Sequence, residues 1–164
     1  MSRHALGERR LGLLLCAGAA GLGAGAMVLA DFDAAVASQA AARINKLAGK
    51  DVATSAQIDV RDFDALVELL TPVDVYLCAV PFKYIMGCTQ AAIYAKTSMV
   101  DLGGHTDTVL KQLKLDEAAK ENGVSVVPDC GMGPGLNNTM GLYTVEQGTL
   151  PGKVEAVEWA QHSL

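Results

Sequence analysis

Apolar residues occur along the chain in two recurring patterns, short continuous runs and helix-like spacings. The first apolar run, 28–33, predicts a strand that ends in two aspartates. The alanine-rich segment 34–47 predicts a helix that ends before Gly49. A second strand is expected over 56–60, and Asp62 is suited to cap a helix whose apolar residues recur at i, i+3, i+4 and i+7.

The same two patterns continue through the second half of the chain. Apolar runs predict strands over 73–80, 98–102 and 124–127, and the segments between them predict helices over 85–96 and 106–121. Strands that alternate with helices at this spacing imply βαβ crossovers and a parallel sheet. The nearly continuous apolar strands suit a sheet covered on both faces. The sequence therefore predicts an α/β fold, a doubly wound parallel sheet of the Rossmann type.

Composition narrows the class of protein. The 164 residues allow about one domain, and 51% of them are hydrophobic, 19% charged and 5% aromatic. The net charge of −5 argues against a nucleic-acid binder, which needs a basic face. Four cysteines without a CxxC pair or a Cys/His cluster predict neither a disulfide scaffold nor a metal site.

Residues 1–27 form a Gly/Ala-rich leader that three interpretations fit. Arg9 and Arg10 precede twenty uncharged residues, of which eleven are Gly or Ala, so insertion as a membrane helix would be weakly driven. The same stretch also resembles a secretory signal. It has the arginines, then an apolar core, then an A-x-A-like site at which the signal would be removed after about residue 26. Alternatively, residues 13–15 are a buried strand before a phosphate-binding turn, for which two registers are possible: residues 16–21, with Cys16 in the first glycine position, or Gly23 and Gly25.

Special residues gather just after the predicted strands, where doubly wound folds bind their ligands. Asp31 or Asp33 could accept hydrogen bonds from an adenosine ribose, although one of them could instead cap the next helix. Gly103 and Gly104 would let backbone approach a ligand. His105 follows them at a predicted helix start and could polarise or protonate a substrate, or be an ordinary surface histidine.

Lys83 and Tyr84 are the other catalytic candidates. They follow Pro81 on a predicted loop, where they could contact a nicotinamide amide or a substrate carboxylate. A solvated loop lysine is the alternative. Cys78, Cys88 and Cys130 are interpreted as small core or loop thiols with no chemistry.

Three motifs in order resemble the saccharopine dehydrogenase family, within it the lysine 6-dehydrogenase-like branch. They are the segments 74–84 (DVYLCAVPFKY), 99–105 (MVDLGGH) and 127–138 (VPDCGMGPGLNN). The resemblance covers roughly residues 28–143. It implies an NAD(P)-dependent oxidoreductase that acts at a carbon–nitrogen bond of an amino acid, through an imine, and that works as a homo-oligomer in the cytoplasm.

The resemblance also implies a set of cofactor contacts. On the nucleotide side these are the glycine turn, Asp31 or Asp33, Asp59, Val60, Ala79, Val80 and Pro81; on the nicotinamide side they are Asp101, Gly103, Gly104 and Gly133. An acid at the end of the strand over 28–33 would repel a 2′-phosphate, which favours NAD over NADP.

Two departures from the family pattern set the expected domain organisation: one is in the first βαβ unit, and the other is in the substrate domain that follows the glycine-rich turn. Too few residues separate the glycines from residue 28 for a three-turn helix, so the first βαβ unit is expected to be incomplete. We expect residues 28–140 to form the NAD(P)-binding domain and residues 141–164 to begin a truncated substrate or dimerisation domain. The chain could then be inactive by itself, a non-catalytic module that pairs with another chain, or an exported protein with a cleaved leader.

Overall fold

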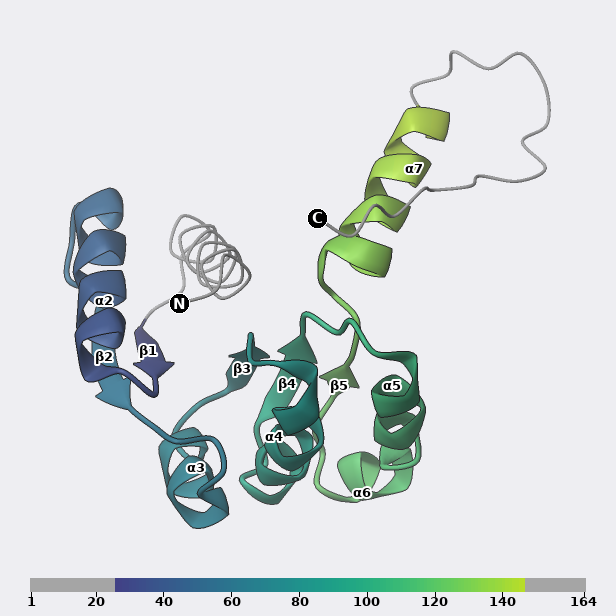
Figure 1. The fold of residues 1–164 in the computed structure, drawn as a ribbon, viewed down its shortest axis with the longest axis horizontal. Coiled ribbons are helices and arrows are strands. Elements are labelled where there is room, and N and C mark those ends of the chain that lie inside the picture. The colour runs from purple at the N-terminus through teal and green to yellow at the C-terminus, as the bar shows by residue number, and fades with distance from the viewer. Residues whose placement is uncertain (1–25, 147–164) are drawn as a thin grey trace.

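The computed structural model describes residues 26–146 as an alternation of parallel strands and helices (Figure 1). The strands are β1 (Met27–Asp31), β2 (Ala53–Gln57), β3 (Val75–Cys78), β4 (Ser98–Asp101) and β5 (Val126–Val127). The helices are α2 (Ala34–Ala48), α3 (Phe63–Leu70), α4 (Phe82–Tyr94), α5 (Thr106–Leu113), α6 (Asp116–Glu121) and α7 (Asn137–Glu146). A π-type turn, η1 (Met132–Leu136), leads into α7 and is interrupted at the extended Gly133.

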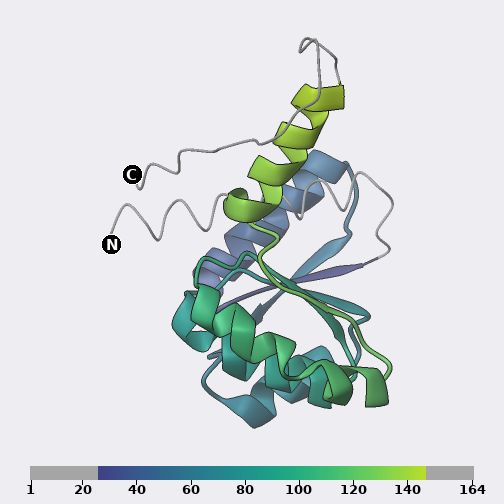
Figure 2. The same cartoon turned by 90° about the vertical axis from the view of Figure 1, so that its right-hand side faces the viewer.

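The described strands form two parallel sheets, one of order β1-β2 and one of order β3-β4-β5. Figure 2 shows the strands as a central layer, with α2 on one side and α3 to α6 on the other. Helices on both faces of parallel strands are the doubly wound arrangement. The fold predicted from the sequence is therefore confirmed.

The predictions for α2 and α3 agree with the structure, because each of these helices begins at a capping aspartate. Asp33 caps α2 by accepting from the N–H of Ala35 at 2.9 Å, and Gly49 ends the helix with φ of +67°. Asp62 caps α3 by accepting from the N–H of Ala65 at 3.1 Å. These contacts satisfy backbone groups that a helix end leaves unpaired.

Several predicted elements have different bounds in the structure. The second strand lies at Ala53–Gln57 rather than 56–60, because Ile58 and Val60 pack against the larger core from the connection that follows it. The helix predicted over 106–121 is broken into α5 and α6 at Lys114 and Leu115. The predicted strand 73–80 is only Val75–Cys78, and α4 begins three residues earlier than expected.

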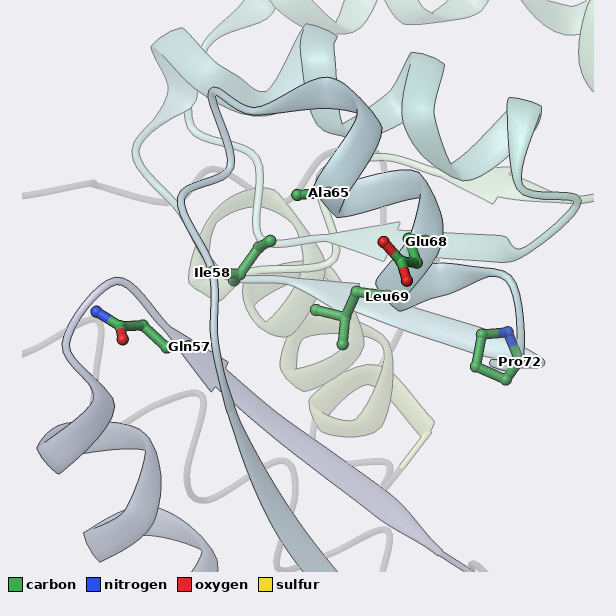
Figure 3. A pocket seen from close by; sticks show the side chains of 6 residues that line it. All are labelled: Gln57, Ile58, Ala65, Glu68, Leu69 and Pro72. Carbon is green, nitrogen blue, oxygen red and sulfur yellow. The ribbon is translucent and has the colours of Figure 1, made fainter.

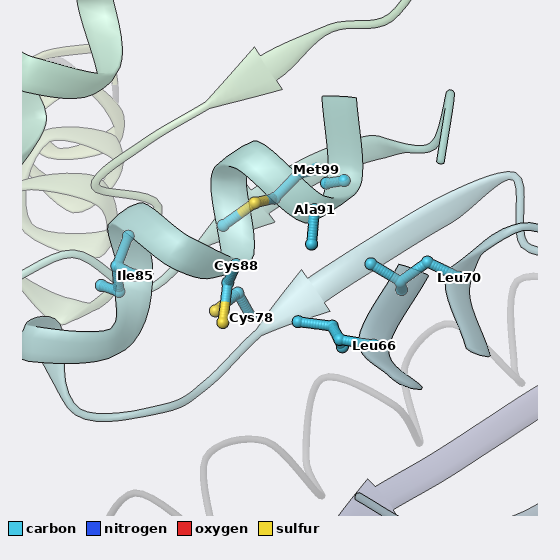
Figure 4. Close-up of a cluster of buried hydrophobic side chains, with 8 residues drawn as sticks. Leu66, Leu70, Cys78, Ile85, Cys88, Ala91 and Met99 are labelled. Carbon is cyan, nitrogen blue, oxygen red and sulfur yellow. The ribbon is translucent and has the colours of Figure 1, made fainter. Parts of the chain in front are cut away.

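Two separate hydrophobic clusters make up the core. The larger cluster joins α3, α4, β3 and β4, and Figure 4 shows its side chains directed toward one another; its buried members are Leu66, Leu70, Cys78, Ile85, Cys88, Ala91, Ala92 and Met99. The smaller cluster joins α2 to the β1-β2 sheet through Ala41, Ile44, Val52 and Ala53. The two clusters share no residue, so each sheet has its own core.

Several predictions concern residues outside the described part of the chain. The leader 1–27 lies almost wholly there, together with Gly23 and Gly25, and so do residues 147–164 of the segment expected to begin a second domain. The division at residue 140 falls inside α7. Within residues 26–146, no helix is long and apolar enough to cross a membrane.

Candidate functional site

The carboxyl ends of the parallel strands define the candidate site, because loops that follow parallel strands gather at one edge of a sheet. Asp31, the last residue of β1, and Asp33, two residues later, make different contacts there. Asp33 is the helix cap described above, which matches the alternative considered for one of the two aspartates. Asp31 accepts from the N–H of Asp33 through Oδ1 at 2.9 Å. Its other carboxylate oxygen has no hydrogen-bond partner among the described residues.

The loop after β2 carries an ion pair. Nε of Arg61 donates to both carboxylate oxygens of Asp59, at 2.9 and 3.0 Å. Because of this pairing with Arg61, the pKa of Asp59 is lowered to about 2. Asp59 and Val60 thus lie in the connection beyond β2, with the Asp59 carboxylate engaged by its neighbour.

The β3 end leads directly into a helix. Ala79, Val80 and Pro81 form the short connection, and the Pro81 carbonyl accepts from the N–H of Tyr84 at 2.9 Å. Lys83 and Tyr84 therefore belong to the first turn of α4, and the prediction of a loop at these residues was wrong. The Lys83 ammonium lies 4.8 Å from the centre of the Tyr84 ring, as in a cation–π contact.

Asp101 connects the loops after β4 and β5. Its side chain is fully buried, and Oδ1 accepts from the N–H of Gly103 at 2.7 Å and of Asp129 at 3.1 Å. Its Oδ2 accepts from Nε2 of Gln112 on α5 at 2.7 Å. That same Nε2 also donates to the hydroxyl of Thr89 on α4, at 2.9 Å. The carboxylate of Asp101 thus joins the loop after β4 to the loop after β5.

The two loops also interlock directly. Asp129 has a left-handed backbone, with φ of +59°, and its Oδ1 accepts from the N–H of Gly104 at 3.0 Å. A side chain at Gly103 (φ +63°) would collide with Asp129, and one at Gly131 would collide with the Leu102 carbonyl. At Gly104, by contrast, a Cβ would have no atom within 4 Å. The backbone at Gly104 is therefore open on the side where a side chain would stand.

His105 is the N-cap of α5. Its Nδ1 accepts from the N–H of Thr108 at 3.3 Å, which leaves the proton of a neutral ring on Nε2. The ring stacks on Phe82 of α4, with centroids 4.4 Å apart and planes 3° apart. This stack brings the loops after β3 and β4 together, and it leaves the Nε2–H as a donor.

Gln112, Thr89 and Phe82 were not predicted as site residues. Thr108 and Gln112 are both buried and lie four residues apart on α5. Two polar residues at i and i+4 on the face that packs inward are a signal that sequence analysis can use. Nothing in the sequence indicates the partner of Phe82, because the stack depends on how α4 and α5 pack together.

The described cysteines are Cys78, Cys88 and Cys130, and the contact with Cys78 lowers the pKa of the buried Cys88 thiol. Contact with the fully buried Cys88 thiol, together with burial, raises the pKa of Cys78. Burial also raises the pKa of Cys130, next to Asp129 in the β5 loop. The thiols of Cys78 and Cys130 therefore stay protonated near neutral pH. Residues 26–146 also hold no group of three His, Cys, Asp or Glu side chains arranged for a metal.

A pocket of about 400 Å³ lies between α3 and the end of β2, beside the loop that carries the Asp59–Arg61 pair (Figure 3). Its lining residues are Gln57, Ile58, Ala65, Glu68, Leu69 and Pro72. Glu68 is its one charged residue, and none of the predicted site residues lines it. The strand-end loops are therefore the better candidate for the ligand site.

Parallel strands with helices on both faces, and aspartate and glycine loops at the strand ends, define a nucleotide-binding domain of the doubly wound class. The family model described as the saccharopine dehydrogenase NADP binding domain matches residues 13–127. The chain belongs to this family, which confirms the resemblance noted in the sequence.

Individual relatives agree with this assignment. A saccharopine dehydrogenase [NADP(+), L-glutamate-forming] of Pyricularia oryzae is 26% identical over 100 residues, which are 61% of this chain and 22% of that protein. The solved structure of apo histidine-tagged saccharopine dehydrogenase (L-Glu forming) from Saccharomyces cerevisiae matches with a TM-score of 0.64 and 20% identity. The match covers 82% of this chain and 28% of the Saccharomyces cerevisiae chain. The chain thus spans about a quarter of the length of these relatives.

Proposed function

We propose that this chain is the cofactor-binding part of an NAD(P)-dependent oxidoreductase that acts on a carbon–nitrogen bond of an amino acid. The observation that carries the proposal is the interlocked pair of glycine loops after β4 and β5, in a chain of a dinucleotide-binding family. Calorimetric titration of the whole chain with NADH and NADPH tests it. Saturable binding of either one is expected, and no binding at millimolar cofactor would refute it.

The residues at the strand ends fit such a cofactor. Asp31 would accept the hydroxyls of the adenosine ribose through its unpartnered oxygen. Val80 and Pro81 would line the middle of the cofactor, and the open backbone at Gly104 would admit its nicotinamide end. The bound nicotinamide supplies the chemistry, by accepting or donating a hydride.

We infer a preference for NAD over NADP, although the family description names NADP. Support comes from Asp31, whose free carboxylate oxygen would lie beside a 2′-phosphate and repel it. A tighter Kd for NADH than for NADPH is expected in wild-type protein, and Asp31→Ser should narrow the difference. Tighter binding of NADPH by wild-type protein would refute the preference.

His105 is the residue we propose to contact the substrate or the nicotinamide amide, through its Nε2–H. His105→Asn is a sharp test, because asparagine also caps helices but has no ring to stack on Phe82. The variant should stay folded, with a melting temperature lowered only by the loss of the stack, and should weaken NADH binding several-fold. Unchanged affinity for NADH in the folded variant would refute a contact with the nicotinamide.

We propose that the protein carries out this amino-acid oxidation in the cytoplasm as a homo-oligomer.

A second candidate function, a module that pairs with another chain, is favoured by exposed apolar side chains along η1 and α7. These are Met132, Leu136, Met140, Leu142 and Tyr143. Light scattering and cofactor titration of the purified chain together separate the candidates: cofactor binding supports the first, and a dimer or larger assembly without cofactor binding supports the second.

A further inference from the structure

The imidazole of His105 is held by contacts from two helices. At one edge of the ring, Nδ1 accepts from the N–H of Thr108 at 3.3 Å, and the Thr108 hydroxyl lies 3.1 Å from the same nitrogen. On one face, the ring stacks on Phe82, the first residue of α4, with centroids 4.4 Å apart and planes 3° apart. A contact at an edge and a contact on a face together fix both the tilt and the rotation of the ring.

These two residues are not what capping and packing alone would require. Short polar side chains are the preferred N-caps, and Asp33 and Asp62 have this role in α2 and α3. At α5 the cap is an imidazole instead. Phe82 is 48% exposed, so the core does not require its ring. Local departures of this kind are expected at functional sites.

Nε2 is the ring nitrogen that these contacts leave free. It has no hydrogen-bond partner among the described residues. In that part of the chain the buried side-chain atom without a partner is Oε1 of Gln112, so Nε2 is open to solvent. Because Nδ1 accepts a hydrogen bond, the neutral ring carries its proton on Nε2. The ring follows Gly104, whose backbone is open, and it therefore presents a fixed N–H donor to a ligand with an acceptor oxygen.

We propose that Phe82 is a positioning residue, whose ring holds the imidazole of His105 so that Nε2–H donates to the carboxamide oxygen of a bound nicotinamide. The inference rests on the proposed function, because it requires a nicotinamide cofactor at the loops after β4 and β5. A side chain that is fixed before the ligand arrives does not have to be ordered on binding. This difference corresponds to about three- to tenfold in affinity.

Calorimetric titration of the whole chain with NADH and with ADP-ribose, which lacks the nicotinamide, tests the proposal. Phe82→Leu removes the stacked ring, whereas Phe82→Tyr keeps it. The leucine variant should bind NADH about three- to tenfold more weakly than wild-type protein does and should bind ADP-ribose equally well. The tyrosine variant should have the wild-type affinity for NADH.

Tyr94→Leu is the matched control. It replaces an aromatic residue at the other end of the same helix, where Tyr94 is 71% exposed, and it should alter neither affinity.

NMR of the histidine ring gives a signature that a merely structural role of Phe82 would not give. The ring current of Phe82 should shift the ring protons of His105 upfield in wild-type protein and in Phe82→Tyr, and the shift should be lost in Phe82→Leu. The nitrogen spectrum should show Nδ1 as the acceptor and Nε2 as the protonated nitrogen. Addition of NADH, but not of ADP-ribose, should move the Nε2 signal.

The outcomes separate this inference from the proposed function. Wild-type affinity for NADH in Phe82→Leu, or an equal loss of affinity for NADH and ADP-ribose, would overturn the inference and leave the proposed function standing. Binding of neither ligand by wild-type protein would overturn both. If Phe82→Leu does not fold, the wild-type spectrum decides, because an Nε2 signal that NADH does not move overturns the inference.

Discussion

Asp101 is the residue whose replacement tests the architecture of the site most directly. Its buried carboxylate accepts from the N–H groups of Gly103 and Asp129 and from Nε2 of Gln112. Asp101→Ala would leave these three donors without their acceptor. Asp101→Asn would keep Oδ1 for the two loops and place an NH₂ group opposite the amide of Gln112.

The expected losses of unfolding free energy in the two variants differ because of one atom, Oε1 of Gln112. Each buried donor left unpaired costs about 1–3 kcal/mol, and water can reach part of the loop, so Asp101→Ala should destabilise the fold by about 3–5 kcal/mol. The Gln112 Oε1 is a buried acceptor with no partner among the described residues. In Asp101→Asn, rotation of the Gln112 amide by 180° would let Oε1 accept from the new NH₂ group. The net loss should then be only about 1 kcal/mol.

Urea unfolding followed by circular dichroism measures both values, provided that the transition is two-state. The double variant Asp101→Asn with Gln112→Glu is the control, because the introduced glutamate carboxylate would accept from the new amide without any rotation. Gln112→Glu alone should be severe, since it sets two carboxylates against each other in a buried position. Two results would refute the reasoning: a loss below about 1 kcal/mol in Asp101→Ala, or equal losses in the Ala and Asn variants.

Three further predictions concern the loops around this centre. Gly103→Ala should cost at least about 2 kcal/mol in urea unfolding, because φ is positive and the methyl group meets the neighbouring loop; a smaller loss would mean that the loops are not interlocked. Asp33→Ala should cost about 1 kcal/mol through the lost helix cap, whereas Asp31→Ala should cost under about 0.5 kcal/mol, and equal losses would contradict the division of roles. NMR titration should give Asp59 a pKa of about 2, and Arg61→Ala should return it toward 3.8. Because this pKa is lowered, the contribution of the ion pair to stability is fully present above pH 3.8 and is lost as the pH falls through about 2; a pKa that Arg61→Ala does not change would contradict the pairing.

The helices could be located from the sequence because their signals are local. A capping aspartate such as Asp33 or Asp62 and an apolar stripe at helical spacing both act within one or two turns. The break between α5 and α6 was missed because no glycine or proline marks it. At Leu115 the chain turns through ordinary residues, so only tertiary packing distinguishes this turn from a continuous helix.

The strands were harder to place because their apolar residues serve more than one purpose. Ile58 and Val60 are apolar since they pack against the larger core, yet they lie outside any strand. β2 itself has the sequence ATSAQ, with three of five residues exposed, as suits a strand at the edge of a sheet. An apolar run therefore locates buried chain, and only pairing with a neighbour decides which part of it becomes a strand.

The position of the candidate loops in the fold could be predicted from the sequence. Aspartates and glycines at the ends of predicted strands lie at the carboxyl ends of the observed strands, and the ligand site there stays a prediction that follows from the fold class. What the sequence could not supply is which carboxylate faces outward. Asp31 and Asp101 are each the last residue of a strand. Asp31 has a carboxylate oxygen with no partner among the described residues, whereas the Asp101 side chain is fully buried and hydrogen-bonded. That difference depends on Gln112, which is eleven residues away from Asp101 and on another element.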